Sequence, residues 1–212
     1  LAPLADPALL PGAIAAALGV REAPGQAILE TLLGVLQRKR LLLVLDNCEH
    51  LLDASAQVAD ALLRRCPGLH MLATSREALG IAGEVSRRVP SLALPAADHL
   101  PPLERLARCE AVQLFRERAA AARPEFVLTE RDAGAVAQLC RRLDGIPLAL
   151  ELAAARTKIL TVTQLAERLD QRFRLLTGGS RTALPRQQTL RAALDWSYDL
   201  LSEPERRLFH RL

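Results

Sequence analysis

One short segment, residues 41–46, limits the folds open to this chain more than any other. Five apolar residues, Leu-Leu-Leu-Val-Leu, run without a break into Asp46. The run lacks the alternation of a strand with one wet face, so it predicts a strand buried on both faces, as in a parallel α/β sheet. An acid at the end of such a strand lies where open α/β sheets bind ligands, and at a phosphate site it would hold Mg²⁺. The segment alone also fits a core strand that ends in an Asp-Asn turn.

The composition is aliphatic, with 50% hydrophobic but only 3% aromatic residues. It favours a core of Leu, Ala and Val, built mainly from helices with a few strands. A length of 212 residues allows one large domain or two smaller ones. The net charge is +4, and the basic residues are spread along the chain. This pattern fits a solvated basic surface better than a nucleic-acid patch.

The cysteines show no metal-site spacing. No two of them form a C-x-x-C pair, and Cys48 with His50 lacks a second pair at ligand spacing. We therefore predict reduced, mostly buried thiols in a cytoplasmic protein. No apolar run approaches the roughly 18 residues that a membrane span needs, so no membrane partner is expected.

The first part of the chain predicts alternating helices and strands. A strand over residues 70–74 follows the first one and leads into Ser75 and Arg76, and a third is suggested near 85–89. Helices are predicted over residues 6–20, 26–38 and 49–65. The order implies right-handed crossovers and a parallel sheet, which brings Asp46 and Arg76 to the same edge.

The second part predicts helices alone. They are expected over residues 108–122, 131–143, 147–160, 162–173, 188–201 and from 203 onward. Two of their starts carry capping boxes, Thr161 with Gln164 and Ser202 with Glu205. A boundary between the α/β and helical parts is expected near residues 90–107, and a further break over 177–186.

Three separate features together suggest phosphate chemistry. Asp46 ends one strand, and Arg76, whose planar fork suits a terminal phosphate, follows the next. Gly145-Ile146-Pro147 opens a helix. Each has a structural alternative, since an arginine can cap a turn and Gly-x-Pro is a common way to begin a helix.

Four segments in this order resemble the STAND class of P-loop NTPases, in the NB-ARC-like modules of bacterial LuxR-type and SARP-type transcriptional regulators. Residues 41–50, Leu-Leu-Leu-Val-Leu-Asp-Asn-Cys-Glu-His, resemble the Walker B strand, and 73–80, Ala-Thr-Ser-Arg-Glu-Ala-Leu-Gly, resemble sensor 1. Residues 142–156 resemble the Gly-x-Pro helical segment, and 185–201 the beginning of the winged-helix domain.

The resemblance implies a fold class and three domains. Residues 1–95 would form an incomplete, ASCE-like α/β parallel-sheet NTPase core with Walker B and sensor 1. Residues 96–178 would form an all-helical domain with the Gly-x-Pro segment. Residues 179–212 would begin a winged-helix domain, in which Trp196 and Tyr198 serve as packing residues rather than as stacking ligands.

The same resemblance assigns roles to six residues. Asp46 would hold the Mg²⁺ of bound ATP or ADP, directly or through water, with Asn47 beside it in the nucleotide site. Arg76 would sense the γ-phosphate. Gly145 and Pro147 would line the adenine pocket. Glu49, the nearest carboxylate, is the candidate catalytic base, so the predicted catalytic residues are Asp46, Glu49 and Arg76; alternatively, Glu49 only favours the start of a helix.

Two departures from the family pattern limit this activity. The phosphate loop G-x-x-x-x-G-K-[ST] is absent, and no Gly-Lys pair occurs. In the family this loop lies upstream on the central strand, so we expect the chain to begin after the second strand and to lack the phosphate cradle. Asn47 stands where many relatives have a second acid, and an amide cannot accept a proton. A slow ATPase is expected for the parent protein.

The leading hypothesis is a nucleotide-dependent signalling switch of a bacterial transcriptional regulator. Its partners would be the nucleotide, the DNA-binding and sensor or repeat domains of the parent chain, and a second copy through self-association; DNA would be contacted only by domains outside this chain. Two alternatives stay open, namely a DNA-binding module that acts through the winged helix, and a helical protein-interaction scaffold without a nucleotide.

Overall fold

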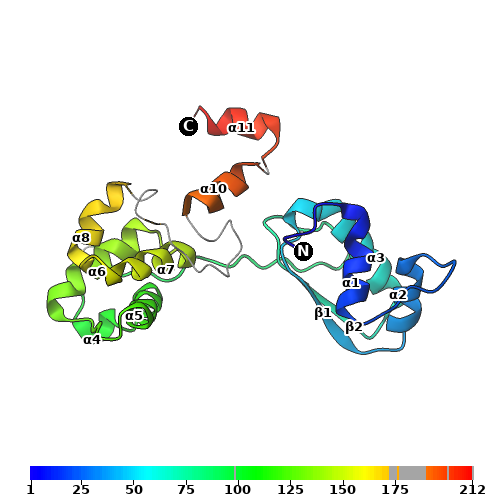
Figure 1. Cartoon of the computed structure of the whole chain (residues 1–212), viewed down its shortest axis with the longest axis horizontal. Coiled ribbons are helices and arrows are strands. Elements are labelled where there is room, and N and C mark those ends of the chain that lie inside the picture. The colour runs from blue at the N-terminus through cyan, green and yellow to red at the C-terminus, as the bar shows by residue number, and fades with distance from the viewer. Residues whose placement is uncertain (98, 172–175, 177–189, 200, 212) are drawn as a thin grey trace. The chain divides into compact units, whose positions relative to one another are not determined.

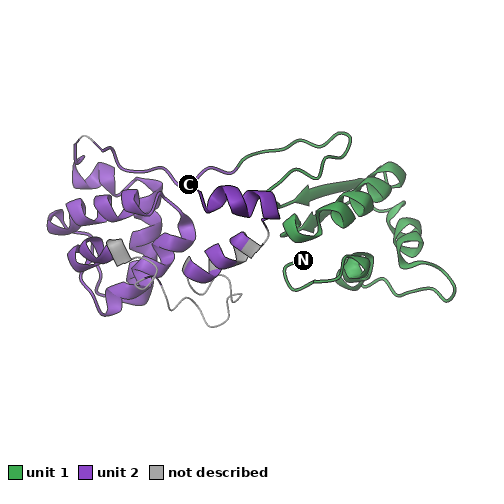
Figure 2. Ribbon diagram, turned by 90° about the horizontal axis from the view of Figure 1, so that it is seen from above, with its two compact units in different colours: residues 1–88 green, residues 89–212 purple. Residues whose placement is uncertain are grey.

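The computed structural model describes residues 1–97, 99–171, 176, 190–199 and 201–211. The chain divides into two compact units, residues 1–88 and 89–212 (Figure 2). Each unit is built around a hydrophobic cluster of its own. The three domain boundaries expected from the sequence stay predictions.

The first unit packs three helices against a two-stranded parallel sheet (Figure 1). Its elements are α1 (Leu10–Ala17), α2 (Ile28–Leu36), β1 (Leu41–Leu45), α3 (Leu52–Arg65) and β2 (Leu69–Ala73), with short 3₁₀ helices at Pro7–Leu9 and Glu49–Leu51. β1 and β2 pair in parallel from Leu41 opposite Leu69 to Leu45 opposite Ala73. The predicted first helix and the helix over 49–65 therefore each begin as a 3₁₀ turn.

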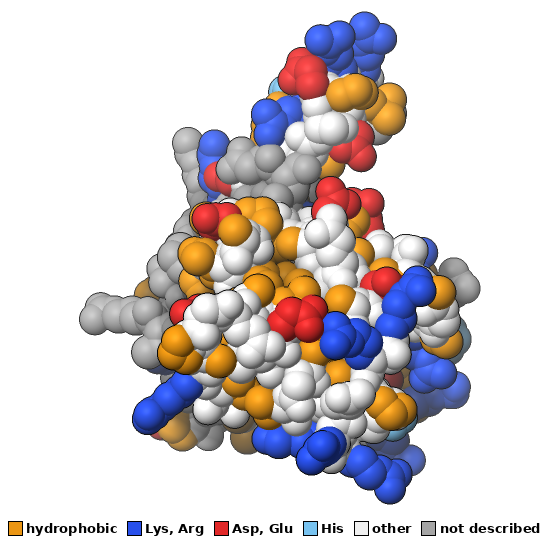
Figure 3. Space-filling view, turned by 90° about the vertical axis from the view of Figure 1, so that its right-hand side faces the viewer, with side chains coloured by type: hydrophobic (Ala, Val, Ile, Leu, Met, Phe, Trp, Pro, Cys, Tyr) orange, Lys and Arg blue, Asp and Glu red, His pale blue; other side chains and the backbone are white. Residues whose placement is uncertain are grey.

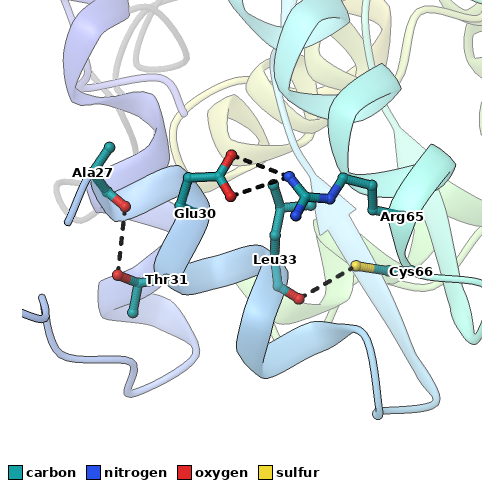
Figure 4. Close-up of polar contacts among 6 residues, drawn as sticks. All are labelled: Ala27, Glu30, Thr31, Leu33, Arg65 and Cys66. Carbon is teal, nitrogen blue, oxygen red and sulfur yellow. Dashed lines mark hydrogen bonds and ion pairs between the residues drawn. The ribbon is translucent and has the colours of Figure 1, made fainter.

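The crossover helix α3 is fixed at its C-terminal end. It is amphipathic, and Val58, Ala59 and Leu62 fill the core at helical spacing. Arg65 Nη1 donates to both carboxylate oxygens of Glu30 on α2, each at 3.1 Å, and the neighbouring Cys66 thiol faces the Leu33 carbonyl (Figure 4). The ion pair is exposed, so the buried apolar residues contribute most of the stability of this packing.

The turn after α3 requires a glycine because two chain segments pass very close to each other. A Cβ atom on Gly68 would lie 2.5 Å from the Lys39 carbonyl oxygen. At the same point the Leu41 amide donates to the Gly68 carbonyl at 3.3 Å. Gly68 thus lets the entries of β1 and β2 approach closely enough to pair.

The prediction that the first strand is buried on both faces is wrong. Leu43 and Leu45 are buried, but Leu42 is 60% exposed and Val44 is 53% exposed. Leu72, which pairs with Val44, is also 53% exposed. Among the described residues the helices cover only one face of the sheet, so alternate side chains of the apolar run remain in solvent.

The third strand suggested near residues 85–89 is also absent. The structure assigns no strand to that segment, and both Val85 and Val89 are almost fully exposed. The sheet among the described residues therefore has two strands. A valine-rich sequence favours extended backbone, but a strand also needs a neighbour to pair with.

The second unit is helical, as predicted. Its helices are α4 (Leu103–Leu106), α5 (Glu110–Ala122), α6 (Glu130–Arg142), α7 (Pro147–Ala155), α8 (Val162–Glu167), α10 (Leu190–Asp199) and α11 (Glu203–Phe209). Short 3₁₀ helices at Arg156–Lys158 and Arg168–Gln171 follow α7 and α8, so the two longer predicted helices are each divided. Phe115 is fully buried in the core and meets Phe126 edge to face at 6.1 Å.

Local signals in this unit were predicted well. The capping boxes of Thr161 with Gln164 and of Ser202 with Glu205 are both present. Tyr198 packs edge to face with Phe209 at 5.8 Å, in keeping with a packing role. The Trp196 side chain lies outside the described residues, as do residues 172–173 of the helix predicted over 162–173 and residues 188–189 and 200 of the helix predicted over 188–201.

The surface gives no sign of a single basic patch on the face seen in Figure 3. Lysine and arginine side chains lie there at several separate places, with acidic and apolar side chains among them. In the described part of the chain, no helix combines the length and the apolarity needed to cross a bilayer.

Burial of Cys140 makes a pH-dependent contribution to stability. Burial raises the pKa of this thiol to about 12 from an ordinary 9.0, so the folded chain holds the proton more tightly than the unfolded chain. The resulting stabilisation is complete below pH 9 and is lost as pH rises toward 12. Relative to Cys140→Ala, the wild type should lose about 2 kcal/mol of unfolding free energy between about pH 8 and about pH 10.5, measured by urea denaturation. A pH-independent difference would contradict this.

The open sheet face should make the isolated chain self-associate. Leu42, Val44 and Leu72 together present a contiguous apolar surface. The double change Val44→Thr and Leu72→Thr should weaken self-association about tenfold in sedimentation equilibrium. Ile159→Thr, at a residue 78% exposed in the second unit, is the matched control and should have little effect. A wild-type chain that stays monomeric would refute this prediction.

Candidate functional site

The ends of β1 and β2 form the candidate site. Because Leu45 lies opposite Ala73 in the parallel register, the next residues, Asp46 and Thr74, leave the sheet side by side. The structure thus brings Asp46 to the same edge as Ser75 and Arg76, where the sequence places them.

Thr74 joins the two strand ends through four hydrogen bonds. Its amide donates to the Leu45 carbonyl, and its own carbonyl accepts from the Cys48 amide, each at 2.9 Å. Its hydroxyl oxygen accepts from the Asn47 amide at 2.8 Å and donates to Asp46 Oδ1 at 2.7 Å. Four consecutive residues, 45–48, are therefore bonded to this one threonine, which extends the pairing beyond β1.

Asn47 turns the chain at this edge. Its φ of 67° lies in the left-handed region, which asparagine tolerates better than most residues. Its side chain is directed to His50, since Nδ2 donates to His50 Nδ1 at 2.9 Å. His50 Nε2 in turn donates to the Leu4 carbonyl at 2.9 Å, and because a carbonyl only accepts, this bond sets the tautomer. Sequence reasoning gave neither His50 nor Thr74 a role in the nucleotide site.

The start of the chain also reaches this edge. The amino group of Leu1 donates to the Asp46 backbone carbonyl at 2.7 Å, and Leu4 receives the bond from His50. The backbone of Asp46 is therefore held from one side by the first residues, and its side chain from the other by Thr74.

Glu49 and Arg76 form an ion pair beside Asp46. Glu49 begins the 3₁₀ helix that leads into α3, and its side chain is only 12% exposed. Arg76 Nε lies 3.5 Å from Glu49 Oε1, and the arginine side chain remains 46% exposed. The pair places a guanidinium at the edge and engages the carboxylate that was expected to act as base. The catalytic role of Glu49 stays a prediction.

The residues at this edge fit one kind of metal coordination and not another. The described residues contain no group of three or more His, Cys, Asp or Glu side chains placed to hold a metal, which speaks against a site of the zinc type. A cation at Asp46 would have one protein carboxylate and take its other ligands from water and phosphate. Mg²⁺ is commonly bound in that way at nucleotide sites.

Gly145 and Pro147 lie in the second unit. Pro147 is the first residue of α7, and Gly145 has a φ of 63°. A Cβ atom at Gly145 would lie 2.4 Å from the Leu92 carbonyl oxygen, and the Leu92 amide donates to the Gly145 carbonyl at 3.1 Å. The turn is thus packed against the segment that precedes α4. A role of Gly145 and Pro147 in an adenine pocket with Asp46 stays a prediction.

The segment after Leu92 is bonded to the helices of the same unit. The Ala93 amide donates to the Glu110 carboxylate, and Arg141 donates to the Ala96 carbonyl, each at 2.9 Å. The Cys109 thiol also donates to the Ala93 carbonyl, at 3.0 Å. The irregular segment of residues 92–96 is therefore anchored by these bonds together with the contact between Leu92 and the Gly-x-Pro turn. The sequence did not reveal this role of the turn.

An apolar groove of about 510 Å³ lies elsewhere in the second unit. It is formed by α4, the C-terminal half of α5 and residues 126–128, with Glu104, Arg116 and Glu117 among its lining residues. None of the predicted site residues lines it. The strand ends of the first unit therefore carry the candidate chemistry.

Comparison with known proteins gives relatives among mycobacterial regulators. The whole chain is 46% identical over 212 residues to a predicted HTH-type transcriptional regulator of Mycobacterium bovis and to one of Mycobacterium tuberculosis, and it covers 23% of each. A second M. bovis protein, whose name states no function, is 47% identical over 196 residues, which are 92% of this chain and 47% of that protein. The chain thus spans less than half the length of these relatives.

No family model and no solved structure matches the chain. The similarity to the predicted regulators extends over both units, so the chain resembles a segment of HTH-type transcriptional regulators that contains both of them. The comparison shows similarity to predicted bacterial transcriptional regulators, and it does not bear on nucleotide binding.

Replacing Gly145 should destabilise the second unit. Gly145→Ala puts a Cβ against the Leu92 carbonyl at a positive φ, so the free energy of unfolding should fall by about 2 kcal/mol. Gly134→Ala is the control, because Gly134 lies within α6 with nothing near its added Cβ. This change should raise stability by about 0.5–1 kcal/mol. Urea denaturation measures both, and equal effects would contradict the anchoring role of Gly145.

Proposed function

We propose that this chain is a nucleotide-dependent switch module of a bacterial transcriptional regulator, and that Mg²⁺ with ATP or ADP binds at the ends of β1 and β2. One observation carries the proposal: a carboxylate and a guanidinium, Asp46 and Arg76, follow two adjacent parallel strands at the same edge. Ligands of open α/β sheets bind at such carboxyl ends. The mycobacterial relatives support the regulator part of the proposal.

Asp46 is the residue that would hold the cation. It is exposed at the end of β1, and within the described residues no donor reaches its Oδ2. Asp46 would hold the Mg²⁺ ion, which would offset the negative charge of the nucleotide phosphates. The neighbouring residues Leu45, Asn47 and Cys48 are fixed by hydrogen bonds to Thr74, so little order would be lost on binding.

Arg76 would distinguish ATP from ADP. Its ion pair with Glu49 is long, at 3.5 Å, and the arginine side chain is 46% exposed, whereas the Glu49 side chain is only 12% exposed. A γ-phosphate offers the guanidinium shorter, charge-assisted hydrogen bonds. Exchange of Glu49 for phosphate would release the carboxylate at the start of the helical segment that continues into α3. This exchange is the physical basis of the proposed switch.

Slow turnover follows from the same arrangement. The side-chain amide of Asn47 is bonded to His50, and it has no basic group that could accept a proton from water. The Glu49 carboxylate is paired with Arg76. The sequence contains no G-x-x-x-x-G-K-[ST] loop. We therefore expect weak nucleotide binding by these 212 residues and little hydrolysis.

An NMR titration of the chain with MgATP and MgADP tests the proposal. Amide signals of Asn47, Cys48 and Thr74 should shift at millimolar nucleotide, and more strongly with MgATP. Asp46→Asn should abolish both effects, because the cation loses its charged ligand, whereas Arg76→Gln should remove only the preference for ATP.

Asp53→Asn is the matched control, since Asp53 is an exposed carboxylate in the first turn of α3. It should leave the titration unchanged. Shifts that persist in Asp46→Asn, or no shifts at this edge, would refute the nucleotide site and favour a scaffold. Submicromolar affinity would contradict the expected weakness of binding.

A further inference from the structure

The turn that leads into β1 carries three consecutive basic residues, 38–40, with the sequence Arg-Lys-Arg. We call these residues the basic turn. All three are exposed, and they follow the end of α2. The backbone of the turn is fixed, because the Lys39 amide donates to the Leu36 carbonyl at 2.9 Å and the Leu41 amide donates to the Gly68 carbonyl at 3.3 Å.

The basic turn differs from the neighbouring end of α3 in how its charges are paired. The two arginines of α3 each meet an acid, Arg64 with Asp60 at 2.8 Å and Arg65 with Glu30 at 3.1 Å (Figure 4). In the part of the chain that the structure describes, no side chain of the basic turn forms an ion pair or a hydrogen bond. The turn after α3 packs against the basic turn, so positive charge is in excess at this end of the sheet.

The helix dipole accounts for the arginines of α3 better than for the basic turn. Cations stabilise the last turn of a helix, and Arg64 and Arg65 lie there in α3. α2 has no basic residue in its last turn, and residues 38–40 come only after its C-cap, Gln37. The charge of the basic turn is therefore available to an anion outside the chain.

This anion would not be the nucleotide of the proposed site. Arg40 directly precedes β1 and Asp46 directly follows it. A strand advances about 3.3 Å per residue, so the backbones of these two residues lie about 20 Å apart. Phosphates held through Asp46 would be too far away to satisfy the basic turn.

Three neighbouring cations suit a polyanion. Double-stranded DNA carries one negative charge per about 1.7 Å of helix axis, and lysine and arginine side chains that neutralise its phosphates release counterions. Contacts to phosphates position a protein on DNA but carry no sequence information. A short turn presents no helix to the major groove, so its contacts would be with the backbone rather than with base edges.

We propose that the basic turn binds the phosphate backbone of double-stranded DNA without reading its sequence. The inference rests on the regulator part of the proposed function, because a module of a transcriptional regulator works close to DNA, and it does not require a bound nucleotide. It departs from the expectation that only domains outside this chain contact DNA. The basic turn supplies affinity and orientation, and reading of the sequence needs other groups.

Fluorescence anisotropy of a short labelled DNA duplex, titrated with the 212-residue chain at several salt concentrations, tests the proposal. The wild type should bind with a dissociation constant of about 1–100 µM at physiological salt. Each phosphate contact contributes about 0.9 to the steepness with which the logarithm of affinity falls with the logarithm of salt concentration. The triple change Arg38→Gln, Lys39→Gln and Arg40→Gln should therefore lower this slope by about 2–3.

The matched control removes the same charge from the second unit, by Arg105→Gln, Arg108→Gln and Arg116→Gln. These arginines are exposed and form no ion pair within the described ranges. The control should leave the slope nearly unchanged. Equal losses in the two triple variants would overturn the inference, because they would indicate a response to net charge alone. A wild type that does not bind DNA, or that binds polyglutamate equally well at the same salt, would also overturn it.

A second measurement needs no variant and separates the two proposals. When DNA is added to the wild type, the NMR amide signals of Lys39 and Leu41 should shift, and that of Asn47 should not; the reverse pattern would overturn the inference. The triple variant should keep the MgATP response of Asn47 and Cys48. A nucleotide response without DNA contact refutes only this inference, whereas DNA contact without a nucleotide response refutes only the nucleotide site.

Discussion

The hydrogen bonding of Thr74 is the interaction on which the candidate site depends. A parallel pair of strands normally stops pairing where its ladder ends, and the residues beyond it are free to diverge. Here a single side chain and its backbone bond to residues 45–48, and so carry order past the end of β1. The left-handed turn at Asn47 and the bond from His50 to Leu4 complete this arrangement. Asp46 is thereby fixed at the edge although it is exposed.

Much of the site could be predicted because it follows from chain direction. Two apolar runs joined by a helix imply parallel strands, and parallel strands place Asp46 and Arg76 at one edge. The contacts of Thr74 could not be predicted in the same way. They depend on the register of the strands and on a positive φ at Asn47, neither of which is encoded in hydrophobic periodicity.

The errors in the fold have a related cause. An apolar run predicts a strand well, but burial of both faces requires covering elements, and the described helices cover only one face. Leu42 and Val44 consequently face solvent, and residues 85–89 lack a pairing neighbour. Helix capping was predicted more accurately, because the box at Thr161 involves only residues three apart. The close approach of Gly145 to Leu92 is a contact between distant segments and had no local signal.

In the proposed nucleotide site, the groups at the strand ends would favour binding and sensing over rapid hydrolysis. Of the side chains nearest to Asp46, Glu49 is paired with Arg76, and Asn47 is bonded to His50 and has no group that could accept a proton from water. The ion pair between Arg76 and Glu49 is long, at 3.5 Å, so in the proposed site a phosphate could replace Glu49 as the partner of the guanidinium. Such a site would suit the proposed switch, in which a bound nucleotide reports a state rather than fuels a reaction.

Native-state hydrogen exchange of the Asn47 and Cys48 amides tests most directly whether Thr74 extends the sheet beyond β1. Both amides donate to Thr74, so they should exchange as slowly as the hydrogen-bonded amides within β1. Exchange as fast as in the exposed segment 85–89 would contradict the account, because Asp46 would then stand on an unordered loop.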